Sequence, residues 1–316
     1  MAITSSPERI LVLRASGLGD LLTALPAMRG LRSAYNTSHI VGAFPSPLLP
    51  LVADCVDEVV DVRAAHSSQG LLALDHYRGP VDLAINLHGK GPQSHRALLR
   101  RHPDKLVAYR SEDIAVEGPP WFDHQHEIDR WCDLVNISLT VDADPHDMYL
   151  AKEAHRTPGL VVLHPGAGHA VKRWPWQYMA NLAQRLHSDG CNVVLTGDES
   201  EVDLVSRIRR ASTLPLTTEL AGRTDMSGLI GLVSEAALVI CGDTGVGHLA
   251  TALKTPSVLL FGPTDPTTWG PRTGPHYVLK GEHMWDITVD EVFKWAHSAI
   301  GVCTQDQGAC REESLS

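Results

Sequence analysis

Short apolar runs of strand length alternate with longer amphipathic stretches of helix length along most of this 316-residue chain. This alternation is typical of parallel sheets, because consecutive parallel strands need a crossover connection and the crossover helices cover both faces of the sheet. The sequence therefore predicts the α/β class. The expected strands are 10–14, 38–43, 58–62, 83–87, 105–108, 159–164, 192–196, 236–241 and 257–261, and the expected helices include 21–33, 176–188, 200–211, 226–235 and 246–253.

The composition is that of an ordinary globular protein, with 43% apolar and 20% charged residues. No apolar run approaches the roughly 20 residues needed to cross a bilayer, and the first residues lack the apolar core of a signal peptide. We therefore expect no transmembrane segment and a cytoplasmic location, with a peripheral contact at the inner membrane face left open. The formal net charge of −10 argues against a general nucleic-acid binder, so no nucleic-acid partner is expected.

The segment 241–271, CGDTGVGHLATALKTPSVLLFGPTDPTTWGP, gathers chemically distinctive residues at one strand-to-helix junction. Asp243, Thr244 and Gly245 fall at the start of a helix, where backbone N–H groups lack partners and the helix dipole favours an anion. His248 lies one turn further along the helix. The pattern favours a site for a nucleotide diphosphate. Two alternatives stay open: Asp243 also fits a simple helix cap, and a single helical histidine is often structural.

Four segments, in this order, resemble glycosyltransferase family 9, the family of ADP-heptose:lipopolysaccharide heptosyltransferases. They are ILVLRASGLGDLLTALPAMRGLR, VVLHPGAGHAVKRWPWQYMANLA, VVLTGDESE, and DTGVGHLATAL followed by FGPTDP, which together span residues 9–271. The resemblance implies an inverting enzyme that moves a sugar, in the first instance heptose from ADP-heptose, to an acceptor hydroxyl without a metal. The partners that it implies are a nucleotide sugar and a glycolipid, oligosaccharide or small-molecule acceptor.

The strand pattern divides into two halves that each resemble a nucleotide-binding domain. Two Rossmann-like domains facing a cleft make the glycosyltransferase-B architecture. A polar stretch rich in Asp and His, 142–157, separates the halves, so we expect an acceptor-binding domain over 1–155 and a nucleotide-sugar-binding domain over 156–285. Thr288 and Glu291 fit a capping box that opens a final helix over 286–301, which is expected to return to the first domain. The polar tail 302–316 is expected to be disordered.

Asp20 is the candidate general base. Sugar transfer needs a base near the acceptor hydroxyl, and Asp20 follows a glycine turn at the carboxyl end of the first strand. The family resemblance also places the proposed catalytic base at this position. The alternatives are a capping carboxylate or the start of a dinucleotide-binding loop, but Leu22 stands where the third glycine of that loop would be.

Other candidate donor-binding residues lie in the second half. Lys172 carries the charge to meet the diphosphate, and the family pattern selects it over Arg173 because of the Trp-Pro that follows. Gly168 offers a backbone N–H group beside it. Glu199, just after a strand, is expected to accept hydrogen bonds from ribose hydroxyls, with Glu201 as its substitute.

The acceptor site is harder to locate from the sequence. The stretch 86–105 contains many cations after a strand, and the resemblance implies that the equivalent region of heptosyltransferases faces an anionic glycolipid core. Lys90, Arg96 and Arg100 are therefore the expected acceptor-binding residues, and an exposed helix face is the alternative for the same charges.

No metal or other cofactor is expected. The FDHQHEID stretch, 122–129, has neither HExxH nor zinc-finger spacing, and the start of a polar helix is the simpler interpretation. Alternative functions are a transferase that uses another nucleotide sugar on a small acceptor, a nucleotide-sugar epimerase, or a non-catalytic sugar-nucleotide-binding module.

Overall fold

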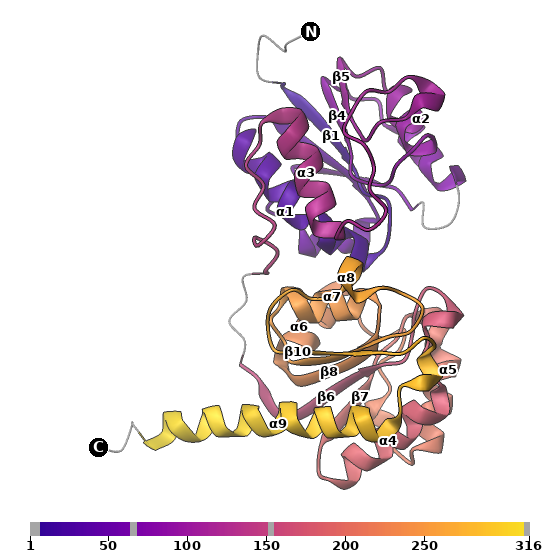
Figure 1. Ribbon diagram of the computed structural model, residues 1–316, viewed down its shortest axis with the longest axis vertical. Helices are drawn as coiled ribbons and strands as arrows, with labels where there is room; N and C mark the ends of the chain where they lie inside the picture. The colour runs from indigo at the N-terminus through magenta and orange to yellow at the C-terminus, as the bar shows by residue number, and fades with distance from the viewer. Residues whose placement is uncertain (1–6, 64–67, 151–154, 313–316) are drawn as a thin grey trace. The chain divides into compact units, whose positions relative to one another are not determined.

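The computed structural model describes residues 7–63, 68–150 and 155–312, and it divides into two compact units, Met1–Met148 and Tyr149–Ser316 (Figure 1). Each unit contains one five-stranded parallel sheet, which confirms the predicted α/β class. The second unit begins at Tyr149, before the predicted boundary at residue 155, because Tyr149 and Leu150 contact residues of the second unit. The Leu150 N–H donates to the Ala252 carbonyl at 2.9 Å, and Lys254 Nζ lies 4.1 Å from the centre of the Tyr149 ring.

The sheet of the first unit has the strand order β3-β2-β1-β4-β5. Its central strand β1 pairs with β2 on one side and with β4 on the other, so the direction in which the chain adds strands reverses between β1 and β4. In open α/β sheets, ligands bind outside the carboxyl ends of the strands at such a switch point. The strands are β1 (Arg9–Leu13), β2 (His39–Phe44), β3 (Glu58–Asp61), β4 (Leu83–Asn86) and β5 (Lys105–Val107).

Helices cover both faces of this first sheet (Figure 1). On one face, alternate β1 residues Leu11 and Leu13 form a core with α2 and the 3-10 helix η2. The long helices α1 and α3 pack against each other on the opposite face. The helical segments are α1 (Leu18–Ala34), η1 (Ser46–Leu51), η2 (Ser68–His76), α2 (Gln93–Leu99), η3 (Glu112–Ile114) and α3 (Glu127–Leu139).

The sheet of the second unit has the order β10-β9-β8-β6-β7, and its switch point lies between β6 and β8. The sequence pattern did not predict β10, because this edge strand is half-exposed and lacks a continuous apolar run. The central strand β8 is buried along its whole length. The strands are β6 (Thr157–His164), β7 (Asn192–Leu195), β8 (Ala236–Gly242), β9 (Ser257–Phe261) and β10 (His276–Lys280).

One face of the second sheet packs against α4, α5 and α9, and the other face against α6 and α7 (Figure 1). Most of these helices begin and end within two residues of the predicted bounds. The helical segments are η4 (Ala170–Lys172), α4 (Trp176–Ser188), η5 (Glu199–Glu201), α5 (Val202–Ala211), η6 (Leu216–Thr218), α6 (Met226–Glu235), α7 (Gly245–Ala252), α8 (Pro266–Trp269), η7 (Met284–Asp286) and α9 (Val289–Glu312).

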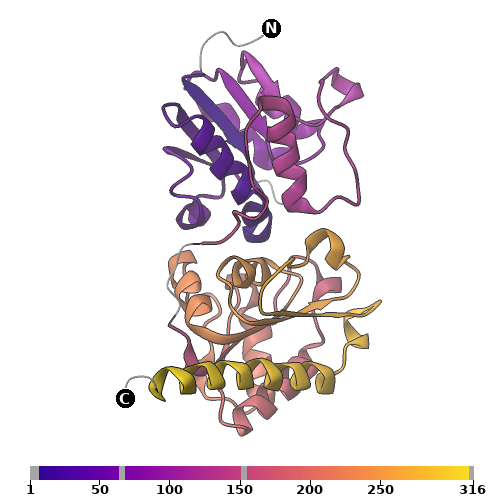
Figure 2. The ribbon, with the colours of Figure 1, turned by 60° about the vertical axis from the view of Figure 1, so that its left-hand side comes forward.

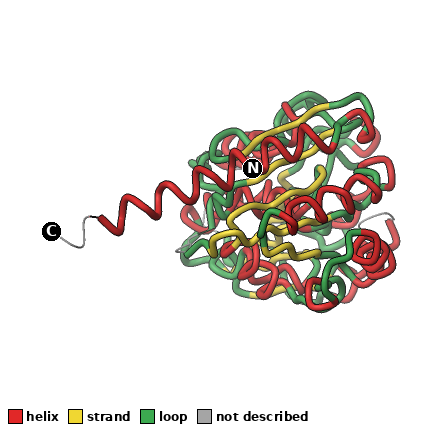
Figure 3. The backbone as a smooth tube through the Cα atoms, turned by 90° about the horizontal axis from the view of Figure 1, so that it is seen from below, coloured by secondary structure: helices red, strands yellow, loops and turns green. Residues whose placement is uncertain are grey.

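The structure corrects the prediction for the tail. α9 packs on the second sheet (Figure 2), where Val292, Ala296 and Ala299 form an apolar stripe that joins the core. Its return to the first domain stays a prediction. The helix also continues past residue 301, where a disordered tail was expected (Figure 3). Once a helix is nucleated, each further residue adds at little cost, and the sequence after 301 contains no proline to stop it. Residues 313–316 lie outside the described part of the chain.

Candidate functional site

At the switch point of the first sheet, Asp20 lies in the first turn of α1, held by a buried arginine. Arg14 follows β1 and is only 2% exposed. Its Nε donates to the Asp20 carbonyl at 2.7 Å, its Nη2 donates to Asp20 Oδ1 at 3.2 Å, and its Nη1 donates to the Leu87 carbonyl at 2.7 Å. The guanidinium therefore ties the end of β1, the start of α1 and the end of β4 together at one point.

The charge of Arg14 is balanced inside the domain. Burial lowers the pKa of the guanidinium, whereas the carboxylates of Asp20 and Glu127 raise it. Glu127 Oε2 lies 4.0 Å from Arg14 Nη2, and the Trp131 ring lies 4.6 Å from the Arg14 guanidinium carbon. A buried arginine keeps its proton, so this charge is a fixed positive point next to the candidate base.

The arrangement leaves one oxygen of Asp20 available. The side chain is 36% exposed, and only Oδ1 is bound by Arg14. Oδ2 makes no hydrogen bond within the described residues. A carboxylate with one fixed oxygen and one free oxygen can accept a proton from a hydroxyl group that approaches it.

A second pair of polar side chains spans the same switch point. Ser16 follows β1 and His88 follows β4, and Ser16 Oγ lies 3.0 Å from His88 Nδ1. Burial and the nearby Arg14 lower the pKa of His88 to about 4, although the Asp20 carboxylate acts in the opposite direction. His88 is therefore neutral near pH 7. The sequence pattern predicts acceptor contacts from cations of the same loop and not from His88.

In the second sheet, the cation and the acid predicted from two distant motifs meet at the switch point. Lys172 follows β6 and Asp243 follows β8, and Lys172 Nζ donates to Asp243 Oδ2 at 2.7 Å. The Asp243 side chain is 6% exposed and that of Lys172 is 26% exposed. The pair is thus shielded on the acidic side and open to solvent on the side of the lysine.

Asp243 does not cap α7, as one alternative would require. The residue at the cap position is Thr244, whose side chain makes no capping hydrogen bond. The N–H groups of Gly245 and Val246 have no acceptor within the described residues, whereas the N–H of Gly247 donates to the Thr244 carbonyl at 3.0 Å. The helix therefore presents two unpaired N–H groups, which is the arrangement that binds phosphate at helix N-termini.

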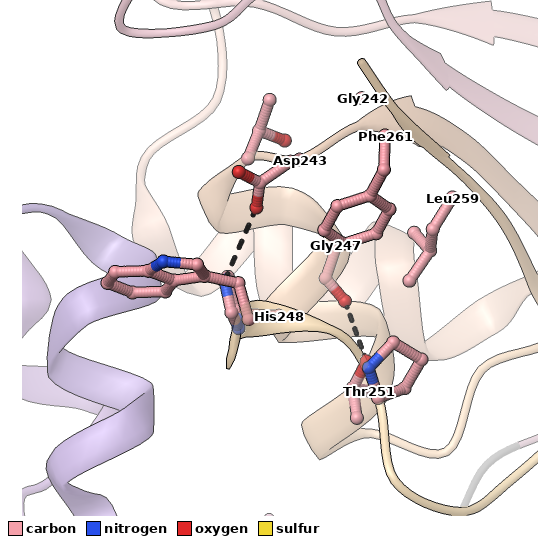
Figure 4. Close-up of a pocket in the computed structure, with 10 residues that line it drawn as sticks. Gly242, Asp243, Gly247, His248, Thr251, Leu259 and Phe261 are labelled. Carbon is pink, nitrogen blue, oxygen red and sulfur yellow. Dashed lines mark hydrogen bonds and ion pairs between the residues drawn. The ribbon is translucent and has the colours of Figure 1, made fainter. Parts of the chain in front are cut away.

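His248 and Asp243 line a pocket beside α7 (Figure 4). Their side chains point toward one another, with His248 Nε2 4.0 Å from Asp243 Oδ1. The Trp269 ring crosses the His248 ring edge-on, with centres 6.1 Å apart. The pocket is lined by Gly242, Asp243, Thr244, Gly247, His248, Thr251, Leu259, Phe261, Trp269 and Pro271.

The structure separates the two glutamates that compete for the ribose role. Glu199 is exposed at the start of η5. Glu201 is buried, and its Oε2 accepts a hydrogen bond from the Asp198 N–H at 3.0 Å. Burial is the strongest influence on the pKa of Glu201 and raises it. Glu199 is therefore the glutamate that remains open to a ligand.

The loop after β6 rests on the Glu201 carboxylate. A Cβ atom at Gly166 would overlap this carboxylate, so the loop passes close to it only because residue 166 has no side chain. Gly168 is exposed, and a Cβ there would meet nothing within 4 Å. Gly166 is thus the glycine that the packing requires, and Gly168 is the one whose backbone is accessible.

The three cations expected to bind the acceptor all follow β4. Lys90 and Arg96 are exposed, in the loop after β4 and on α2 respectively. Arg100 is engaged with η2, since its Nε lies 2.9 Å from Asp75 Oδ1. Both the exposed helix face and the acceptor site stay open as interpretations of Arg96 and Arg100.

The acidic and histidine-rich stretch 122–129 forms the start of α3, as its simpler interpretation predicts. His126 occupies the cap position, and its Nδ1 accepts a hydrogen bond from the Ile128 N–H at 3.2 Å. Among the residues that the structure describes, no group of three or more His, Cys, Asp or Glu side chains gathers where it could hold a metal ion. In the same residues no helix is long and apolar enough to span a bilayer.

Comparison with known proteins shows what this chain is similar to. The model of glycosyltransferase family 9 (heptosyltransferase) matches residues 120–287. Lipopolysaccharide heptosyltransferase 2 of Salmonella typhimurium is 30% identical over 162 residues, which are 45% of this chain and 47% of that protein. The chain thus matches about half the length of this curated relative.

Two solved structures share the fold. A glycosyltransferase family 9 protein from Veillonella parvula superposes with a TM-score of 0.76 at 19% identity, covering 93% of this chain and 97% of the other. E. coli ADP-heptose LPS heptosyltransferase II superposes with a TM-score of 0.72 at 21% identity, covering 95% and 99%. These likenesses confirm the predicted glycosyltransferase-B fold with its two Rossmann-like domains.

Proposed function

Because the chain belongs to glycosyltransferase family 9, a family of glycosyltransferase enzymes whose model matches residues 120–287, we propose that it moves a heptose from ADP-heptose to an acceptor hydroxyl. The acceptor in this proposal is a core sugar of a lipopolysaccharide, because the matched relative is a lipopolysaccharide heptosyltransferase. The bond between the sugar and the diphosphate breaks, ADP leaves, and the acceptor oxygen takes its place on the sugar.

One observation carries the proposal for the donor. Lys172 and Asp243 lie 71 positions apart in the sequence and meet at 2.7 Å beside the unpaired N–H groups of α7. A cation and a helix N-terminus together stabilise the negative charge that develops on a departing diphosphate. Glu199 and Gly168 add an exposed carboxylate and an exposed backbone at neighbouring strand ends.

Asp20 is the general base of the proposed reaction. Its free Oδ2 accepts the proton of the acceptor hydroxyl while Arg14 holds the rest of the carboxylate in place. The acceptor oxygen, as it loses this proton, attacks the anomeric carbon while the bond to the diphosphate breaks, and this single displacement inverts the configuration of that carbon. The residues assigned here supply proton transfer, orientation and charge stabilisation, and no step is assigned to a metal.

The test is a transfer assay with ADP-heptose and a lipopolysaccharide core oligosaccharide that lacks heptose. We expect wild-type protein to form a heptosylated product of inverted configuration, and Asp20→Asn to lower kcat by about 10²- to 10⁴-fold while ADP binding stays unchanged. Asp113→Asn, an exposed aspartate in η3, is the matched control and should retain full activity. An unaltered rate in Asp20→Asn would exclude the assigned base.

Nucleotide titration and the transfer assay together separate the remaining alternative functions. Calorimetric titration with ADP, UDP, GDP and dTDP identifies the nucleotide, and selective binding of any other than ADP would exclude the heptose donor. Conversion of the donor without an acceptor would indicate an epimerase. Binding of ADP without transfer to any acceptor would indicate a binding module.

A further inference from the structure

We propose that His88, oriented by Ser16, is a substrate-binding residue that hydrogen-bonds a hydroxyl group of the acceptor beside Asp20. This inference rests on the proposed function, since it takes Asp20 as the base of a sugar transfer. It adds a contact for the acceptor that neither the sequence motifs nor the exposed cations of the first domain provide.

Ser16 and His88 lie at the edge of the first sheet where a ligand is expected to bind. Ser16 and His88 follow the two adjacent strands, β1 and β4, between which the strand order reverses. The crevice at the carboxyl ends of two such strands is where open α/β sheets bind small molecules. Asp20 starts from the same edge, at the beginning of the helix that follows β1.

The loop that carries His88 is held in place by a buried amide. The Asn86 side chain is fully buried, and its Oδ1 accepts a hydrogen bond from the His88 N–H at 3.0 Å. Its Nδ2 donates to Ser94 Oγ at 2.9 Å and to the Gly89 carbonyl at 3.2 Å. The imidazole therefore sits on an anchored backbone, and Ser16 fixes one of its ring nitrogens from the side.

The other ring nitrogen is available for a ligand. His88 Nε2 makes no hydrogen bond within the described residues, and the side chain is partly exposed. A neutral imidazole offers one donor and one acceptor, so with Nδ1 engaged by a hydroxyl, Nε2 is left to bind one polar group. Burial, together with the fixed positive charge of Arg14 nearby, lowers the pKa of His88 and keeps the ring neutral.

The chemistry of this contact selects the kind of group that it binds. A neutral ring next to the Asp20 carboxylate suits an uncharged hydroxyl, which can both donate and accept a hydrogen bond. The ligand class is thus a hydroxyl-rich sugar of the acceptor. A phosphate or carboxylate of the acceptor would be repelled by Asp20 and must bind elsewhere.

Two substitutions separate the two ring nitrogens. The amide of His88→Asn ends where Nδ1 lies, so it keeps the contact with Ser16 and loses the reach of Nε2. The amide of His88→Gln ends where Nε2 lies. With ADP-heptose and the heptose-free core oligosaccharide, we expect His88→Asn to raise the acceptor KM about tenfold or more, and His88→Gln to raise it less than about threefold. The KM for ADP-heptose should not change in either variant.

Matched control variants and a measurement on wild-type protein keep the test valid if a His88 variant misfolds. The exposed His76, at the end of η2, supplies matched controls in His76→Asn and His76→Gln, which should leave both KM values unaltered. In wild-type protein labelled with ¹⁵N in its histidines, addition of the oligosaccharide should shift the Nε2 resonance of His88. That measurement needs no variant.

The outcomes distinguish this inference from the proposed function. If wild-type protein transfers heptose but His88→Asn and His88→Gln share the wild-type acceptor KM, or raise it equally, the assignment of His88 is overturned while Asp20 keeps its role. An unmoved His88 resonance at saturating oligosaccharide overturns it as well. If wild-type protein transfers no heptose to the oligosaccharide, the proposed function fails, and the inference fails with it.

Discussion

Lys172 Nζ lies 2.7 Å from Asp243 Oδ2, so the strongest candidate for phosphate binding already has a carboxylate partner in the second domain. Asp243 is almost fully buried, and Lys172 bridges from it toward solvent. The Asp243 carboxylate therefore orients Lys172. A negatively charged diphosphate must compete with this carboxylate for the lysine ammonium group.

This pairing predicts unequal effects for the two residues. Lys172→Met should weaken ADP binding by about tenfold or more, because the diphosphate loses a charged hydrogen-bond donor. Asp243→Asn should weaken it less, since the amide still orients the lysine and a negative charge near the diphosphate is removed. Titration calorimetry measures both, and Arg173→Met is the neighbouring control. Equal losses in Lys172→Met and Arg173→Met would contradict the choice of Lys172.

Arg14 is expected to act on catalysis through Asp20. Arg14→Lys keeps the charge but cannot donate to the Asp20 carbonyl, Asp20 Oδ1 and the Leu87 carbonyl at once, so kcat should fall by about tenfold with unchanged ADP affinity. Arg63→Lys, on an exposed arginine, is the control. Steady-state kinetics with calorimetry tests this prediction, and a wild-type kcat in Arg14→Lys would show that Asp20 needs no such support.

The two glycines of the loop after β6 form a matched pair for stability. Gly166→Ala should lower the free energy of unfolding by about 1–3 kcal/mol, because its Cβ overlaps the buried Glu201 carboxylate and the loop must shift. Gly168→Ala meets open space and should change stability by less than about 0.5 kcal/mol. Denaturant titration compares them. Similar losses in both variants would mean that the loop does not rest on Glu201.

The buried histidine His164 predicts a loss of stability in acid. Burial lowers the pKa of His164 to about 4, whereas an unfolded histidine titrates near its usual 6.5, so the unfolded state binds the extra proton first. Stability contributed by neutral His164 is complete above pH 6.5 and is lost as the pH falls from there to about 4.

The size of this effect is set by the same two pKa values. The side chain is 13% exposed, and the loss should reach about 3 kcal/mol at pH 4. Urea titrations of wild-type protein and His164→Gln between pH 7 and pH 4 measure it. The variant should show a smaller slope of stability with pH. Identical slopes would assign the acid sensitivity to other groups, such as His276, whose pKa is also lowered to about 4.

Much of the fold follows from the sequence because strand and helix periodicities are local. The strand 257–261 and the helices 176–188 and 226–235 have the same bounds in the structure as in the sequence pattern. The docking position of α9 could not be predicted in this way. An apolar stripe indicates that one face of a helix is buried, but it does not identify the element that covers this face. The edge strand β10 was not predicted, because it is half-exposed and its sequence lacks a continuous apolar run.

Site residues that stand in local motifs could be predicted from the sequence, whereas those that depend on distant contacts could not. Asp20, Lys172 and Asp243 stand in motifs, so their place after a strand can be read from their neighbours in the sequence. The role of Arg14 depends on the Leu87 carbonyl, 73 positions away, and no local pattern encodes that contact. His88 was within reach of prediction, because it follows a strand that a parallel sheet places at the same edge as Ser16.

The two strand orders also bear on how specificity can change. Each proposed site, Asp20 with His88 and Lys172 with Asp243, is assembled from the strand ends of a single sheet. A substitution that alters the acceptor contacts therefore leaves the packing around the donor residues intact, and the reverse also holds. Under the proposed function, such a chain can change its acceptor while its sugar donor stays the same.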